Sequence, residues 1–145
     1  MIDMYTPARQ CTTYMRDALA SLSSPSLLLH STVSRTTPLY VSCHRGHMEV
    51  IRFLVDSKVD LDSAASNGWT PVHIAARKGR FEVVRLLTSH GADLNKAALD
   101  GATALHAAVM NDHFDVAEFL LKNGADPNLA IDTGELPVMI AARRG

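Results

Sequence analysis

The amino-acid sequence predicts an all-α repeat solenoid, and three observations lead to that fold class. First, residues 70–95 read as one complete helix–turn–helix unit followed by a loop. Second, the features of that unit return every 33 residues, as with Thr37, Thr70 and Thr103. Third, the second helix of the unit carries an apolar stripe too wide for one helix pair to bury. A unit that cannot bury its own apolar face needs neighbours, and a fixed period of this length indicates a repeat array.

The central unit contains start and stop signals for two helices. Thr70 can cap the first helix, because its hydroxyl can accept a backbone N–H one turn further on. Pro71 suits the first helical position, where no N–H is needed. Gly79 and Gly91 can end the two helices, since glycine adopts positive φ without strain. The apolar stripe of the second helix consists of Phe81, Val83, Val84, Leu86 and Leu87.

The periodic pattern divides the chain into two parts. Residues 1–33 are interpreted either as a degenerate capping repeat or as a leader, with a break rich in serine and proline at 21–26. Residues 34–145 form the array, with units at about 37–69, 70–102 and 103–135 and a partial unit at 136–145. Because the last unit has only its first helix, we expect a fragment of a longer array or a frayed end.

Three segments carry the resemblance to a known family: TPVHIAARKGRFEVVRLLTSHGADLN, TALHAAVMNDHFDVAEFLLKNGADPN and TPLYVSCHRGHMEVIRFLVDSKVDLD. Each resembles an ankyrin repeat, which has a 33-residue period and a Thr-Pro-Leu-His signature. The resemblance covers Thr37 to Gly145. It implies an ankyrin-like stack of helix–turn–helix units joined by β-hairpin-like turns.

Five departures from the family pattern can be tested in the structure. Lys58 and Asp112 replace glycines that end helices, so strain is expected at Lys58, whereas Asp tolerates positive φ better. Tyr40 replaces the signature histidine, and Cys43 replaces a buried alanine. Leu136 replaces the threonine cap of the last unit.

The interior is expected to combine small and large residues. The pairs Ala75-Ala76 and Ala141-Ala142 let adjacent first helices approach closely. The residues predicted to fill the seam between repeats are Phe81, Leu87, Phe114, Phe119 and Leu120. In the last helix, Val138, Met139 and Ile140 are expected to be only partly covered.

The composition argues against several classes of function. The net charge of −1 gives no general attraction to nucleic acid or anionic membranes. Cys11 and Cys43 cannot form a disulfide framework or a four-ligand zinc site. The sequence contains no catalytic motif, so neither an enzyme nor a cofactor is expected. His73 and His106 occupy equivalent positions, and the resemblance implies that they are structural residues rather than metal ligands.

The residues that the repeat pattern does not dictate are the candidates for binding a partner. One set ends the first helices: His44, Arg45, Arg77, Lys78, Met110, Asn111, Arg143 and Arg144. The other set lies in the projecting turns and includes Trp69, Leu99, Asp100 and Asp132. The resemblance implies that both sets line a concave face. Trp69 is either an interface anchor or a residue packed over the turn, and the basic set is either a binding ridge or a complement to the helix dipoles.

The predicted function is a non-enzymatic protein–protein interaction module that binds a partner protein or peptide, with an acidic or phosphorylated segment favoured. The alternative is a regulatory or targeting segment of a larger enzyme, channel or ubiquitin-ligase adaptor; nucleic-acid binding is disfavoured. We expect an intracellular monomer, cytoplasmic or nuclear, with no membrane insertion and no small-molecule substrate. The resemblance also implies that Asn95 and Asn128 are candidates for hydroxylation.

Overall fold

The computed structural model describes residues 36–145 of the chain. The expectations for residues 1–33, including the capping repeat, and for Cys11 therefore lie outside the described residues. Within residues 36–145 the chain is all-helical and has no strand, as predicted.

The helices follow the predicted period closely. The first helices of the four units are α2 (Pro38–Arg45), α4 (Pro71–Arg77), α6 (Ala104–Met110) and α8 (Pro137–Arg144). The second helices are α3 (Met48–Asp56), α5 (Phe81–Ser89) and α7 (Phe114–Lys122). Successive helices of each kind begin 33 residues apart, at 38, 71, 104 and 137 and at 48, 81 and 114. The local start and stop signals therefore act at the same place in every unit.

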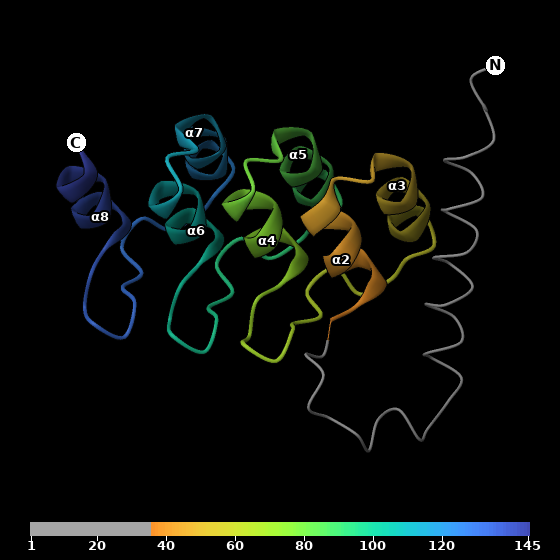
Figure 1. Ribbon diagram of the computed structural model, residues 1–145, viewed down its shortest axis with the longest axis horizontal. Helices are drawn as coiled ribbons and strands as arrows, with labels where there is room; N and C mark the ends of the chain where they lie inside the picture. The colour runs from red at the N-terminus through yellow and green to blue at the C-terminus, as the bar shows by residue number, and fades with distance from the viewer. Residues whose placement is uncertain (1–35) are drawn as a thin grey trace.

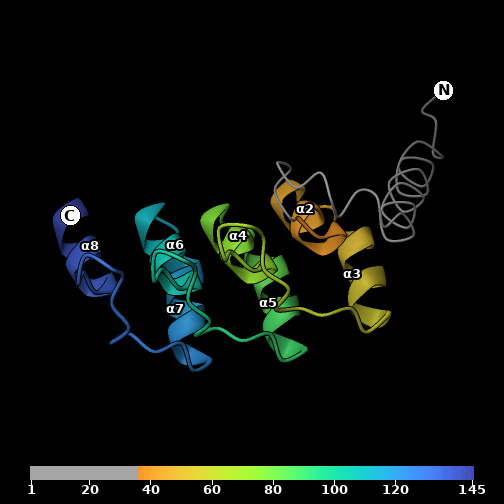
Figure 2. The ribbon, with the colours of Figure 1, turned by 90° about the horizontal axis from the view of Figure 1, so that it is seen from below.

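The helices form two rows. In the first row α4 packs between α2 and α6, and α6 packs on α8; in the second row α5 packs between α3 and α7. Each second helix also packs on the first helix of its own unit. Figure 2 shows the two rows side by side, and Figure 1 shows the connecting loops projecting to one side of them.

The core lies between the two rows and combines small and large residues as predicted. Ala75 and Ala76 in α4 are fully buried, which lets the neighbouring first helices approach. Leu87 in α5 and Leu120 in α7 are also fully buried and fill the space between units. Phe81 packs edge-on against Phe119 of the next unit, with ring centroids 5.3 Å apart.

The prediction for Phe114 is wrong, because this side chain is 53% exposed. Phe114 occupies the position of Phe81 one unit later, and Phe81 is covered by a second helix of the following unit. No second helix follows α7 in residues 36–145. The same lack of a neighbour exposes Ala142, Val138 and Met139. The expectation that Ile140 is only partly covered is wrong, because this side chain packs into the core and is 2% exposed.

The backbone at the helix ends agrees with the sequence analysis. Gly79 has φ 64° and Gly91 has φ 88°, both in the left-handed region. Lys58 and Asp112 adopt the same conformation, with φ 60° and 61°. The expected strain at Lys58 is therefore present, because a side chain with a Cβ is disfavoured there. Leu136 makes no side-chain cap at the start of α8.

Candidate interaction surface

Three hairpin turns, at residues 65–69, 98–102 and 131–135, project beside the first helices. In each turn the first residue donates its N–H to the carbonyl oxygen of the last, over 2.8, 2.8 and 3.0 Å. Leu99 donates its N–H to the Asn67 carbonyl (3.1 Å), and Asp132 donates to the Asp100 carbonyl (2.9 Å). A Cβ on Gly68 would lie 2.7 Å from the Leu99 nitrogen, so only glycine fits that close approach. The turns therefore form one continuous ladder.

Two buried histidines attach this ladder to the helices. The N–H of Thr70 donates to Nδ1 of His73 (3.2 Å), and Nε2 of His73 lies 3.0 Å from the carbonyl oxygen of Ala102. Because Nδ1 accepts and a carbonyl can only accept, the proton of the neutral ring is on Nε2. His106 repeats this arrangement with Thr103 (3.2 Å) and the Glu135 carbonyl (3.4 Å). The structural role predicted for both histidines is confirmed.

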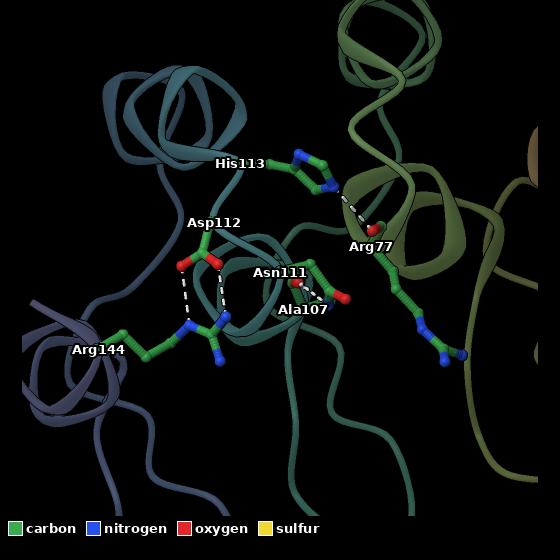
Figure 3. A network of polar contacts seen from close by, with 6 residues as sticks. All are labelled: Arg77, Ala107, Asn111, Asp112, His113 and Arg144. Atoms are coloured by element: carbon green, nitrogen blue, oxygen red, sulfur yellow. Dashed lines mark hydrogen bonds and ion pairs between the residues drawn. The ribbon is translucent and has the colours of Figure 1, made fainter.

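The ends of the first helices expose most of the first candidate set. His44, Arg45, Arg77, Lys78 and Met110 are exposed at the ends of α2, α4 and α6. Asn111 is also exposed, but its amide donates to the Ala107 carbonyl of its own helix (2.8 Å) (Figure 3). In the turns, Leu99 is 75% exposed, and Asp100 and Asp132 are exposed beside it on the ladder.

The two arginines of α8 are engaged within the chain. Arg143 pairs with Glu135 at 2.5 Å. Arg144 pairs with Asp112 through two hydrogen bonds, which Figure 3 shows as a fork on the carboxylate. These hydrogen bonds hold the pKa of Asp112 below its ordinary value. Among the candidate basic residues, those that have no ion pair in the described part of the chain therefore lie at the ends of α2 and α4.

Trp69 is half-buried and packs against the core. Its ring lies 5.8 Å from the ring of His73, at a tilt of 38°. The guanidinium carbon of Arg77 lies over the Trp69 ring, 5.5 Å from its centroid. Trp69 thus both covers the turn and holds the Arg77 side chain against the inner surface, which we define as the exposed ends of the first helices together with the hairpin turns.

A groove of about 500 Å³ opens in the inner surface between α2, α4 and the first hairpin turn. Its lining residues are Thr36, Tyr40, Val41, His44, Arg45, Ala65, Ser66, Asn67, Ile74 and Arg77. Desolvation lowers the pKa of His44, and the charges of Lys78, Arg45, Arg77 and Arg80 lower it further. Four cations thus act on one side chain at the rim of this groove.

Sequence reasoning missed three residues of this region. Tyr40 occupies the position of His73 and His106 but lines the groove, and burial raises the pKa of its hydroxyl. Arg80 donates to the Arg45 carbonyl (3.3 Å), and His113 bonds to the Arg77 carbonyl (3.0 Å; Figure 3). Arg80 and His113 occupy equivalent positions, and each joins its own unit to the end of the first helix of the preceding unit. The signal in the sequence that could have identified them is their spacing of 33 residues, which places Arg80 and His113 at the same position of successive units.

The loops that follow the second helices are also joined between units. Oδ1 of Asp62 accepts the N–H of Asp93 (2.9 Å), and Oδ1 of Asn95 accepts the N–H of Asp126 (2.7 Å). The Asn95 amide also donates to the Gly124 carbonyl (3.1 Å). Asn95 and Asn128 are both exposed, and their hydroxylation stays a prediction.

Chemical groups suited to catalysis or metal binding are sparse in residues 36–145. Cys43 is fully buried, and desolvation raises the pKa of its thiol to about 12, so it is held as the neutral thiol. No cluster of three or more His, Cys, Asp or Glu side chains suited to a metal occurs among these residues. In the same segment, no helix has the length and apolar character needed to span a membrane.

Comparison with known families gives one match. A family model described as ankyrin repeats matches the chain in three overlapping copies, over residues 17–98, 67–131 and 95–145. No curated protein matches the chain.

Proposed function

Because the chain belongs to the ankyrin repeat family, whose members are generally protein–protein interaction modules, we propose that it binds a partner protein or peptide on its inner, concave surface. The proposed activity is recognition without catalysis. The contact residues of the proposal are His44, Arg45, Trp69, Arg77, Lys78, Leu99, Asp100, Met110, Asn111 and Asp132.

The observation that carries the proposal is the exposure of large side chains on a rigid part of the fold. Leu99 is 75% exposed and Met110 is 47% exposed, although both belong to well-packed elements. The hairpin ladder and the buried histidines fix the backbone beneath them. A backbone that is already fixed loses little conformational entropy on binding, which favours affinity.

The charge pattern of the surface supports a partner with an anionic segment. Arg45, Arg77 and Lys78 lie at the first two units and have no ion pair within residues 36–145. Arg143 and Arg144 do not enter this part of the proposal, because Glu135 and Asp112 already neutralise them. We therefore expect association that weakens as the salt concentration rises.

Site-specific photo-crosslinking in cells tests where the partner binds. A photoreactive amino acid at Leu99, on the inner surface, should give a discrete crosslinked species. The matched control is the same amino acid at Arg85, an exposed position on the outer helix α5, which should give none. Crosslinks from position 85 that equal or exceed those from position 99 would contradict an inner binding surface.

A further inference from the structure

We propose that the groove between α2, α4 and the first hairpin turn binds a phosphorylated serine or threonine side chain of an extended peptide, and that Leu99 contacts an apolar side chain of the same peptide. This inference rests on the proposed function and specifies its ligand. It assigns a phosphomonoester site to Arg45 and Arg77 and a specificity contact to Leu99.

The lining of the groove is basic or neutral. Two of its lining residues are arginines from different helices, Arg45 of α2 and Arg77 of α4, and none of the ten lining residues is Asp or Glu. Neither arginine has an ion pair in residues 36–145. Guanidinium groups recognise phosphate through paired, charge-assisted hydrogen bonds, so two of them in the lining of one groove suit a dianion.

The Trp69 ring orients one of these cations. The guanidinium carbon of Arg77 lies 5.5 Å from the Trp69 ring centroid, and stacking of this kind leaves the N–H groups free to donate. Thr36 and Tyr40 add hydroxyl groups to the groove lining. A phosphate offers three acceptor oxygens, which match this set of donors better than the two oxygens of a carboxylate.

Within residues 36–145, this arrangement occurs only at the interface between the first two units. At the end of α8, the equivalent cations Arg143 and Arg144 are neutralised by Glu135 and Asp112. At the end of α6, the equivalent residues are Met110 and Asn111, which carry no charge. Complementarity to helix dipoles accounts for cations at the ends of α2 and α4, but it does not account for a groove without acids between them. The anion site is therefore confined to the first two units.

The position of Leu99 adds a second element of recognition. Its N–H donates to the carbonyl of Asn67, which lines the groove, so Leu99 is one hairpin turn away from the phosphate site. Neighbouring helices lie about 8–10 Å apart, and an extended peptide advances about 3.3 Å per residue. An apolar residue about three positions from the phosphorylated residue would therefore reach Leu99.

The test uses the full chain of 145 residues and defined peptides. Two fluorescent probes carry phosphoserine in a glycine background, one with leucine three positions before it and one with leucine three positions after it. Binding is measured by fluorescence anisotropy, and ¹⁵N-labelled protein is titrated with the tighter probe. We expect chemical-shift changes at residues 40–45 and 65–77. We also expect loss of about tenfold in affinity or more when serine or glutamate replaces phosphoserine.

Matched variants separate the site from general charge. Arg45→Gln with Arg77→Gln should lower the affinity for the phosphopeptide at least about tenfold. Arg52→Gln with Arg85→Gln removes the same charge from the outer side of the same two units and should leave the affinity unchanged. Leu99→Ser should lower the affinity for the probe with leucine but not for its serine-substituted counterpart.

Three results would overturn the inference: equal binding of the unphosphorylated peptide, equal losses in the two double variants, or tighter binding of single-stranded RNA or phosphatidylserine vesicles than of either phosphopeptide. The proposed function would survive each of these if crosslinking from position 99 still captured a protein. Crosslinking from position 85 alone would instead refute the proposed function and leave the peptide measurements to stand separately.

Discussion

The neutral, buried histidines predict that the array loses stability in mild acid. His73 accepts the N–H of Thr70 at Nδ1 (3.2 Å) and donates from Nε2 to the Ala102 carbonyl (3.0 Å). A proton added at Nδ1 would face the Thr70 N–H and would have to donate to the Thr70 hydroxyl oxygen at 2.7 Å, and it would place a positive charge in a fully buried position. Burial lowers the pKa of His73 and of His106, although the charge of Asp100 opposes that change at both.

The sign and size of the effect follow from proton linkage. Both histidines bind protons less readily in the folded chain than in the unfolded chain, where the ordinary value is 6.5. Their contribution to stability is complete above about pH 7.5 and is lost as the pH falls below 6.5 toward the lowered folded-state pKa. Each histidine can reduce the free energy of unfolding by at most about 1.4 kcal/mol per pH unit. The Nε2–H bonds to the Ala102 and Glu135 carbonyls favour the protonated rings, so they oppose this loss at both histidines.

Urea denaturation at pH 7.5, 6.5 and 5.5 measures this dependence. His73→Gln keeps a donor and an acceptor but cannot titrate, so it should be less stable at pH 7.5 and should show a shallower decline with acid. His90→Gln is the control at an exposed position and should follow the wild-type decline. Wild-type stability that is flat from pH 7.5 to 5.5, or an unchanged slope in His73→Gln, would refute the reasoning.

Four further predictions test other parts of the structure. Leu87→Ala should reduce the free energy of unfolding by about 2–5 kcal/mol in urea denaturation, because the side chain is fully buried. Leu121→Ala, at a position 46% exposed, should cost no more than about 0.5 kcal/mol; equal effects would contradict the core assignment. Lys58→Gly should raise the thermal midpoint by relieving a φ of 60°, worth about 1 kcal/mol, and a lowered midpoint would show that no strain is stored there. Cys43 should react with iodoacetamide only in denaturant, as followed by peptide mass spectrometry, and rapid labelling of the native chain would contradict its burial. Intact-mass analysis of the chain from its native cells should show the addition of one oxygen atom if Asn95 is hydroxylated, and an unmodified mass would end that prediction.

The periodic parts of the fold could be predicted because they depend on signals within a few residues of each other. Pro71 and Gly79 set the limits of a helix through local backbone preferences, so the helix starts recur at the expected spacing. The histidine at 73 could also be placed, since its partner Thr70 is three residues away and the next hairpin is one period away.

The rest depended on tertiary contacts that the repeat register does not encode. The sequence predicts Arg144 as part of a basic ridge, because it does not reveal that Asp112, 32 residues earlier, is its ion-pair partner. Phe114 has the sequence context of a core residue, but its exposure is decided by whether a second helix covers it. The charge of the inner surface could not be predicted from the order of basic residues alone, because ion pairs neutralise Arg143 and Arg144.

Most of the hydrogen bonds that join the units in residues 36–145 span about one period. The bond from His73 to Ala102 links residues 29 apart, and the bond from His113 to Arg77 links residues 36 apart. Each interface therefore closes a chain loop of similar and modest length, so each carries a similar entropic cost of closure. Folding can start at any adjacent pair of units and spread in both directions, as expected for a one-dimensional system. Under a stretching force the same connectivity would release the chain in successive steps, one unit at a time.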